Sequence, residues 1–225
     1  MWEGQCRAAS DAQIFRGKYG IEAFEPGADW DGPYYGADWG FSQDPTTLVR
    51  AWIHERRLYV EHEAYEIGWD IDRTPAMFDR VPDARRHAIY ADCARPETIS
   101  YMLAHGFPKM KACDKWQGSV EDGIAHLRQY ERIVVHPRCV HTVEELRLYS
   151  YKKDRLTGDV KADPEDRNNH IIDALRYALG PLIKKQPYSG FFKYIEPDLD
   201  RIRRERTAVQ VVQTGTTMRT SADTW

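Results

Sequence analysis

The sequence predicts a mixed α/β fold, with a central β-sheet that carries helices on both of its faces. Three apolar segments with strand character come early in the chain, at residues 34–38, 47–53 and 57–64. Segments with strand and helix patterns then alternate from residue 87 to residue 149, and one more helical pattern follows them. Strands that alternate with helices form a sheet whose faces the helices cover.

The early strands are joined by short turns. Residues 40–45 combine glycine, serine, aspartate and proline, a composition typical of a turn. Only Glu55 and Arg56 separate the second strand from the third, so these two strands are expected to form a hairpin. Residues 68–78 are expected to form the first helix.

The second half of the chain is expected to alternate strand and helix. Gly106 stands where a helix C-cap belongs, and Ser119 is expected to cap a later helix. The expected elements are a strand at 87–92, a helix at 95–105, a strand at 109–113, a helix from Ser119, a strand at 132–136, a helix at 140–149, a hairpin over 151–160, and a helix that Asn168 or Asn169 caps and that reaches about Leu182.

Composition indicates a globular protein without a strongly basic surface. The hydrophobic fraction is 42%, with seven Trp and thirteen Tyr, which excludes a disordered chain. The 225 residues suffice for one large or two small domains. The net charge is −3, although Lys and Arg outnumber Asp and Glu by 14 to 10 between residues 147 and 206. This local excess is compatible with nucleic-acid binding but does not establish it.

The cysteines and the apolar segments favour a soluble protein of a reducing compartment. The four cysteines are scattered without a Cys-x-x-Cys pair, which argues against a structural zinc site and against a disulfide framework. We recognise no signal peptide, and no apolar run approaches the roughly 18 residues of a membrane span. An intracellular location is therefore expected.

Three aspartates stand in unusual apolar settings. Asp38 ends the run 34–37, Asp92 ends the run 88–91, and Asp173 lies inside an apolar helical segment. A carboxylate in such a place is costly to desolvate unless it is paired or binds a metal ion. Adjacent strands could bring the first two to one edge of the sheet. The sequence therefore predicts an acidic cluster that holds divalent metal.

His170 precedes Asp173 by three residues, so both side chains share one face of the final helix. Hard cations prefer oxygen ligands, and two such ions can activate water and stabilise the leaving oxygen of a phosphodiester. Each aspartate taken alone is more often a turn residue, a cap or a partner of the helix dipole. His170 could equally be a surface residue, so the prediction depends on the whole set.

Basic residues provide weaker candidates for DNA contact. Lys152, Lys153 and Arg155 lie on the expected hairpin, and Lys115 precedes a helix. Such side chains suit phosphate contacts, which position DNA without reading its sequence. A solvated basic turn explains them as well. Asp44, which precedes a proline, is interpreted as a turn residue rather than a metal neighbour.

Four blocks of sequence resemble the nuclease domain of the terminase large subunits of tailed bacteriophages. They are Gly-Ala-Asp-Trp-Gly-Phe at 36–41, Ile-Tyr-Ala-Asp at 89–92, residues 115–124, and Asn-His-Ile-Ile-Asp-Ala-Leu-Arg-Tyr at 169–177. The resemblance covers roughly residues 34–182. It implies an RNase H-like fold and an endonuclease that cuts concatemeric viral DNA with Mg²⁺ or Mn²⁺.

When the family's motifs are matched to this sequence, the resemblance implies that Asp38, Asp92 and Asp173 are catalytic and bind metal. Two metal ions are expected. His170 would be an auxiliary ligand or a group that orients phosphate or water. The implied domains are an extension from a packaging ATPase at 1–33, the nuclease at 34–186, and a tail at 187–225 that is partly disordered or binds a partner. No Gly-x-x-x-x-Gly-Lys-Ser/Thr loop occurs, so no ATPase activity is expected from this chain.

The function that the resemblance implies is cutting of double-stranded DNA with little sequence specificity, in the host cytoplasm at the procapsid. Expected partners are DNA, the terminase ATPase domain, the small terminase subunit and the portal protein, and no membrane is involved. Two alternatives remain open. One is another RNase H-like nuclease, such as a junction resolvase. The other is a non-catalytic docking module of the packaging motor.

Overall fold

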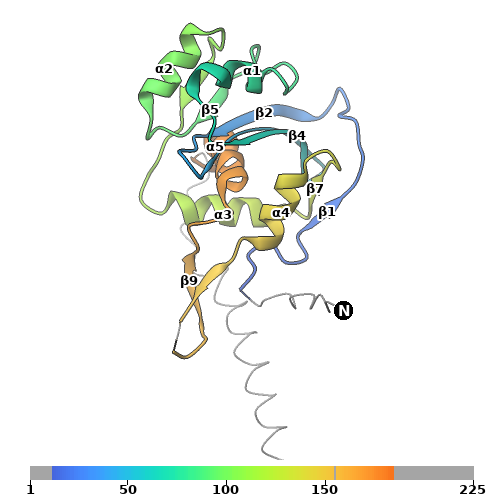
Figure 1. Cartoon of the computed structure of the whole chain (residues 1–225). Helices are drawn as coiled ribbons and strands as arrows, with labels where there is room; N and C mark the ends of the chain where they lie inside the picture. Colours follow the sequence, from blue (N-terminus) through green and yellow to red (C-terminus); the bar gives the residue numbers. More distant parts are fainter. Residues whose placement is uncertain (1–11, 155, 185–225) are drawn as a thin grey trace, which may run out of the picture. The chain divides into compact units, whose positions relative to one another are not determined.

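The computed structural model describes residues 12–154 and 156–184 and contains a seven-stranded sheet with helices on both faces. Figure 1 shows α1 and α2 on one side of the sheet and α3, α4 and α5 on the other. The elements are β1 (Tyr19–Ile21), β2 (Asp31–Asp38), β3 (Pro45–His54), β4 (Arg57–Ile67), the 3-10 helix η1 (Ile71–Arg73), α1 (Thr74–Phe78), β5 (Ile89–Ala91), α2 (Pro96–Ala104), β6 (Met110–Ala112), α3 (Ser119–Gln129), β7 (Ile133–Val135), α4 (Val140–Leu148), β8 (Tyr151–Lys153), β9 (Val160–Pro164) and α5 (His170–Lys184).

The strand order is β1-β7-β4-β3-β2-β5-β6. β3 pairs antiparallel with both β2 and β4, and every other pairing in this sheet is parallel. β5 and β6 therefore run in the same direction as β2, and their carboxyl ends lie at the same edge as that of β2. Parallel strands need crossover connections, and helices provide them here. This arrangement confirms the predicted fold class.

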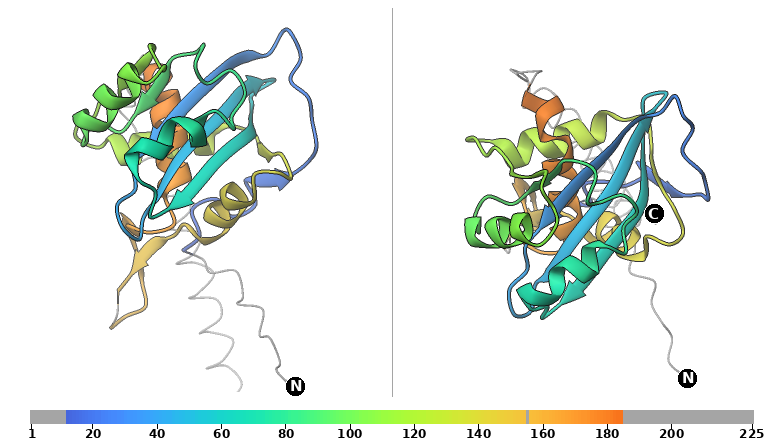
Figure 2. Two further views of the ribbon diagram at one scale, coloured as in Figure 1. Left: turned by 45° about the horizontal axis from the view of Figure 1, so that its top comes forward. Right: turned by 90° about the horizontal axis from the view of Figure 1, so that it is seen from above.

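The hairpin between β3 and β4 forms as predicted. Glu55 and Arg56 make its tip with positive φ angles of 46° and 63°. Two residues with positive φ are what a type I′ turn requires, and its twist matches that of the flanking strands. The three long strands β2, β3 and β4 lie side by side, and α5 (orange) lies on the far face in the right-hand view of Figure 2.

Alternation along β2 sends its side chains to two different layers. Tyr35 and Ala37 belong to the core between the sheet and the layer of α1 and α2, together with Phe78, Met102 and other apolar residues. Gly36 and Asp38 point to the opposite face, where α5 lies. A single strand therefore supplies both a core and a polar site.

Several local predictions differ from the structure. The expected helix at 68–78 is only η1 followed by the short α1. Pro75, which has no backbone N–H, lies in the first turn of α1, where helices accept proline most readily. Ser119 is the first residue of α3 rather than its cap, and Gly118 occupies the cap position with a φ of 83°. Within the stretch 1–33, which the sequence suggests is an extension, residues 19–21 form the edge strand β1 beside β7.

The β8–β9 hairpin forms a second, two-stranded sheet that extends the predicted hairpin to Pro164. None of the helices within the described ranges is long and apolar enough to cross a membrane. The tail at 187–225 lies outside the described residues.

Candidate active site

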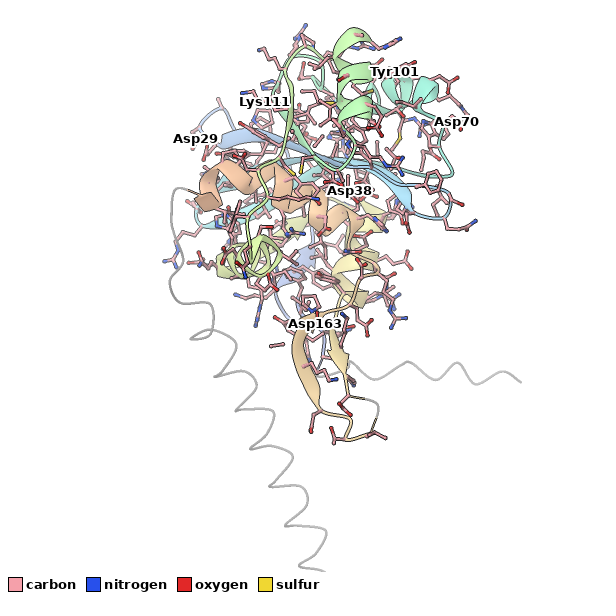
Figure 3. The ribbon with its side chains drawn as sticks, turned by 90° about the vertical axis from the view of Figure 1, so that its left-hand side faces the viewer. Asp29, Asp38, Asp70, Tyr101, Lys111 and Asp163 are labelled. Atoms are coloured by element: carbon pink, nitrogen blue, oxygen red, sulfur yellow. The ribbon has the colours of Figure 1, made fainter. Side chains whose placement is uncertain are left out.

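Asp38 occupies the last position of β2 and is 8% exposed. It pairs in register with Thr47 of β3, and the preceding Ala37 pairs with Ala91 of β5. Because side chains alternate along a strand, the carboxylate of Asp38 faces α5 rather than the apolar core on the other side. Figure 3 shows Asp38 beside this helix.

Asp92 follows the neighbouring parallel strand β5. Its backbone N–H donates to the carbonyl oxygen of Ala37 at 3.0 Å, and its own carbonyl accepts the indole N–H of Trp39 at 3.0 Å. These bonds hold the chain after Asp92 against the chain around Asp38. Both aspartates thus lie at the same edge of the sheet, as the sequence predicts.

Helix α5 approaches this edge unusually closely, and Gly36 makes the approach possible. A Cβ atom at Gly36 would lie 1.9 Å from the carbonyl oxygen of Ala174 and 2.6 Å from the backbone nitrogen of Ala178. The helix axis therefore crosses β2 directly over a position without a side chain. This crossing brings the first turn of α5, with His170 and Asp173, to the carboxylate of Asp38.

His170 is the residue of α5 that contacts Asp38 directly. Its Nδ1 lies 3.1 Å from Oδ2 of Asp38, and its Nε2 lies 3.8 Å from Oδ1 of Asp44. Burial by itself would lower the pKa of His170, but the hydrogen bond and charge of Asp38 outweigh burial and raise this pKa above its ordinary value. Asp44, which the sequence analysis interprets as a turn residue, therefore lies next to His170 of the cluster.

Asp173 is held from its own helix. Its carboxylate forms an ion pair with Arg176, and its side chain is 17% exposed. Burial raises the pKa of Asp173 to about 6; Arg176 lowers this pKa, and the charge of Asp38 raises it further. This mutual influence follows from the strand and the helix placing the two carboxylates near each other.

Each aspartate of the cluster has one basic partner from the protein. His170 contacts Asp38, Lys115 forms an ion pair with Asp92, and Arg176 forms an ion pair with Asp173. The ring of Tyr177 lies near two of these partners, with its centroid 5.4 Å from Lys115 and 5.5 Å from Arg176. Burial raises the pKa of Tyr177, and the charges of the three aspartates raise it further. The partners offset the repulsion that three neighbouring carboxylates would otherwise suffer.

The donor set suits a hard divalent cation because carboxylate oxygens dominate it. Asp38, Asp92 and Asp173 could hold such a cation, with His170 at the side. Within the described ranges, one group of three metal-ligand atoms has all members within 4.8 Å of one another, formed by Asp92, Cys93 and Cys113. The three aspartates do not form such a compact group in the described part of the chain, and their basic partners occupy part of the space around them.

The family model described as "Terminase RNAseH like domain" matches residues 38–180, which include all of these side chains. This chain belongs to that family. The terminase large subunit of Bacillus phage SPP1 is 32% identical over 163 residues, which cover 70% of this chain and 38% of that protein. The PBSX phage terminase large subunit of Bacillus subtilis is 26% identical over 170 residues, covering 75% and 39%.

Solved structures of terminase nuclease domains share the fold. The nuclease domain of the SPP1 large terminase with bound Mn is 30% identical, with a TM-score of 0.64, and the match covers 72% of this chain and 95% of that one. The P22 large terminase nuclease domain is 18% identical with a TM-score of 0.60, covering 76% and 92%. The predicted recognition as a terminase nuclease domain and the RNase H-like fold are therefore confirmed.

The basic residues expected to contact DNA have different surroundings in this terminase domain. Lys115 lies in the cluster itself, where its ammonium contacts Asp92 and the ring of Tyr177. Lys152 forms an ion pair of 2.7 Å with Asp163 within the β8–β9 hairpin, and Lys153 is exposed. Arg155 lies outside the described residues. Whether these side chains contact DNA stays a prediction.

The sequence did not single out Glu145, a residue of α4 that binds the first turn of α5 and so helps to position the site. This buried residue of α4 accepts hydrogen bonds from the backbone N–H groups of Ile171 at 2.7 Å and Ile172 at 3.3 Å. Burial raises the pKa of Glu145 to about 7, although these hydrogen bonds lower it. Its carboxylate thereby occupies the positive end of α5. The signal was its spacing from Thr142, which places it on the buried face of α4.

Proposed function

We propose that this chain is a metal-dependent endodeoxyribonuclease that cuts concatemeric double-stranded DNA with little sequence preference during viral genome packaging. The observation that supports it most is the position of Asp38 and Asp92 at one edge of the sheet, with Asp173 on the helix that crosses β2 and a basic partner beside each carboxylate. Membership of the terminase family supplies the substrate class. The bound Mn of the SPP1 nuclease domain supports the dependence on metal.

Asp38, Asp92 and Asp173 would hold two divalent ions, Mg²⁺ or Mn²⁺, and His170 would serve as an auxiliary ligand or orient phosphate or water. Bound ions of this kind activate water for attack on phosphorus and stabilise the leaving oxygen. The hydrogen bond between His170 and Asp38 orients both groups. Since Nδ1 of His170 is bonded to Asp38, its Nε2 is the ring atom that could reach a phosphate oxygen or a water.

Lys115 and Arg176 have different roles in this proposal. Arg176 is buried and holds Asp173 in place, so it orients the carboxylate rather than contacting substrate. Lys115 is partly exposed beside Asp92. Its positive charge favours the approach of a DNA phosphate toward the cluster.

The partners and location of this chain follow as part of the same proposal. The curated relatives are larger proteins, of which this chain matches 38% and 39%. The proposed setting is therefore a packaging assembly with a terminase ATPase domain, a small terminase subunit and a portal protein, working on DNA in the host cytoplasm at the procapsid. ATP hydrolysis is not proposed for the described domain.

Nicking of supercoiled plasmid tests the proposal. The protein is incubated with plasmid in Mn²⁺ or Mg²⁺, with and without EDTA, beside the variants Asp38→Asn, Asp92→Asn and Asp173→Asn. We expect metal-dependent nicking by the wild type and a loss of at least a hundredfold in each variant, because a carboxamide is a neutral and much poorer ligand for a hard cation.

Asp29→Asn is the matched control, since Asp29 is an exposed aspartate on the loop before β2 (Figure 3). It should nick like the wild type. Unchanged cutting by a folded Asp38→Asn or Asp173→Asn protein would overturn the assignment of these residues. The absence of metal-dependent nicking by the wild type would instead favour the docking module, and preferential cutting of branched DNA would favour a junction-resolving nuclease.

A further inference from the structure

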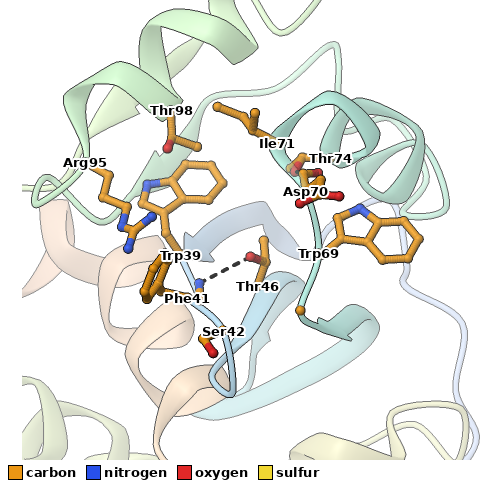
Figure 4. A pocket seen from close by; sticks show the side chains of 12 residues that line it. Trp39, Phe41, Ser42, Thr46, Trp69, Asp70, Ile71, Thr74, Arg95 and Thr98 are labelled. Carbon is orange, nitrogen blue, oxygen red and sulfur yellow. Dashed lines mark hydrogen bonds between the residues drawn. The ribbon is translucent and has the colours of Figure 1, made fainter.

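A cavity of about 360 Å³ lies at the same edge of the sheet as the acidic cluster, but on the face that carries α1 and α2 rather than the face that carries α5. Its walls come from the loop after β2, the start of β3, the turn after β4 and the start of α2. Figure 4 shows Arg95 and Phe41 on one side of the cavity and Asp70 and Thr74 on the other. Its volume is at the lower end of the range of ligand pockets, roughly 300–1,000 Å³.

The cavity shares two chain segments with the catalytic cluster. The loop that carries Phe41 begins directly after Asp38, and Arg95 follows Asp92 by three residues. The mouth of the cavity and these aspartates therefore lie at the same edge of the sheet, within reach of one bound DNA strand. Proximity of this kind makes the DNA itself the first candidate occupant.

Phe41 is 70% exposed, although its ring is large and apolar. The guanidinium of Arg95 stacks over this ring, 5.0 Å from its centroid. Among the residues that the structure describes, Arg95 has no carboxylate partner. A guanidinium that stacks on an aromatic face keeps its in-plane N–H groups for an anion, and a phosphate accepts them in pairs.

The loop that presents Phe41 is held in place. The backbone N–H of Gly40 donates to Oγ1 of Thr46 at 3.2 Å, as the dashed line in Figure 4 shows. The backbone N–H of Asp44 donates to the carbonyl oxygen of Phe41 at 3.1 Å. A Cβ atom at Gly40 would lie 2.0 Å from the carbonyl oxygen of Asp44, so the turn excludes any other residue there. The exposed ring is therefore pre-positioned.

We propose that this cavity receives one unstacked nucleotide of the DNA strand next to the scissile phosphate, with its base against Phe41 and its phosphate on Arg95. Every base has a π-face, so stacking accepts any sequence, in keeping with cutting of little sequence specificity. The hydroxyl groups of Thr46 and Thr74 line the same cavity. This inference rests on the proposed nuclease function and adds a subsite for its substrate.

Binding of a short single strand in EDTA tests the subsite without any cutting. The probe is fluorescein-labelled (dT)12, and its anisotropy is followed with wild type, Phe41→Ala, Phe41→Trp and Arg95→Ala. We expect Phe41→Ala to weaken binding about tenfold and Phe41→Trp to bind within about twofold of wild type, since stacking on an aromatic ring is retained. Arg95→Ala should lower the slope of log K against log salt by about 0.7, the value for one phosphate contact with a single strand.

Ile21→Ala is the matched control, because Ile21 is an apolar residue that is 58% exposed on β1, the strand at the opposite end of the sheet from β5 and β6. It should bind like the wild type. A 5-iodouracil version of the probe, cross-linked by light, should label the peptide that contains Trp39 and Phe41. Wild-type affinity of both Phe41→Ala and Arg95→Ala, or cross-linking only elsewhere, would overturn the subsite.

The outcomes separate this inference from the proposed function. If both Phe41→Ala and Arg95→Ala bind the probe like wild type while the wild-type protein nicks plasmid in Mn²⁺, the subsite is wrong and the nuclease stands. If Phe41→Ala and Arg95→Ala weaken binding as expected but the wild type does not nick, the nucleotide site stands and the nuclease is wrong.

Discussion

The acidic cluster and the β8–β9 hairpin both contain aspartates paired with basic residues, yet the two regions differ in how the pairs are held. In the cluster, Asp38 and His170 are 132 residues apart in sequence and are brought together by the crossing of α5 over β2. In the hairpin, Lys152 and Asp163 lie across one small two-stranded sheet and remain in contact with water. Charges of the same kind therefore depend on packing in one region and on local structure in the other.

This difference predicts which changes matter. Burial makes Arg176 and His170 costly to remove from the cluster, because the charge that remains cannot recover its hydration. The partners in the hairpin are exposed, so removing one should change the free energy of unfolding little, because water and salt ions stabilise the charge that remains. The following substitutions test that contrast.

Gly36→Ala should have the largest effect. The new methyl group would collide with the backbone of Ala174 and Ala178, so α5 must move and withdraw His170 and Asp173 from Asp38. We expect a loss of several kcal/mol of unfolding free energy, in line with overpacking against rigid backbone, together with loss of nicking. Urea denaturation and the plasmid assay measure the two.

Gly180→Ala is the control for this change, because Gly180 lies in the same helix and a Cβ atom there meets nothing within 4 Å. It should stabilise the protein by about 0.5–1 kcal/mol through helix propensity. If Gly36→Ala were as stable and as active as the wild type, close crossing of α5 would not be what positions the cluster.

Arg176→Ala should rank second, because it leaves Asp173 without its ion-pair partner in a nearly buried position. Removing one partner of a buried pair costs about 3–5 kcal/mol. In the Asp173→Asn background the same substitution should cost much less, and this non-additivity, measured by urea denaturation, identifies the pair as the cause. Equal costs in both backgrounds would show that Arg176 stabilises through packing alone.

Glu145→Gln should change how stability depends on pH. The pKa of Glu145 is raised to about 7 in the folded protein from its ordinary value of 4.5, so folding favours the protonated form. The contribution of Glu145 to the free energy of unfolding is therefore most favourable below about pH 4.5. It declines as the pH rises toward 7 and is constant above pH 7. The decline amounts to no more than about 3 kcal/mol.

The Gln variant should lack this decline, so the difference between wild type and variant in unfolding free energy should change between pH 4.5 and 7. Glu144→Gln is the control, since Glu144 is the exposed neighbour on the same helix. It should follow the wild-type profile. Parallel profiles for Glu145→Gln and wild type would show that Glu145 is not protonated more readily in the folded state.

Lys152→Ala and Lys153→Ala should have the smallest effects. Both side chains lie on the exposed hairpin, so thermal unfolding should be unchanged in either variant. If the hairpin contacts duplex DNA as predicted, each lysine that touches a phosphate should lower the salt slope of binding by about 0.9. A large loss of stability in either variant would contradict the contrast between the two regions.

Much of this protein was decided by its sequence alone. Alternation and turn residues predict the strands around Asp38 and Asp92, and the three-residue spacing predicts that His170 and Asp173 share a face. These are local properties, because a strand or a helix repeats its geometry over a few residues. The fold class and the shared edge of the first two aspartates follow from the order of such elements.

Only the tertiary structure decided which distant residues support the cluster. Nothing in the spacing of Gly36 predicts that α5 crosses over it, or that Glu145 of α4 caps that helix, or that Arg176 rather than solvent balances Asp173. Residues 19–21 likewise become a strand only because β7 offers an open edge. These features depend on how the layers pack. Burial and close approach arise between two elements, so the residue pattern of either element alone does not reveal them.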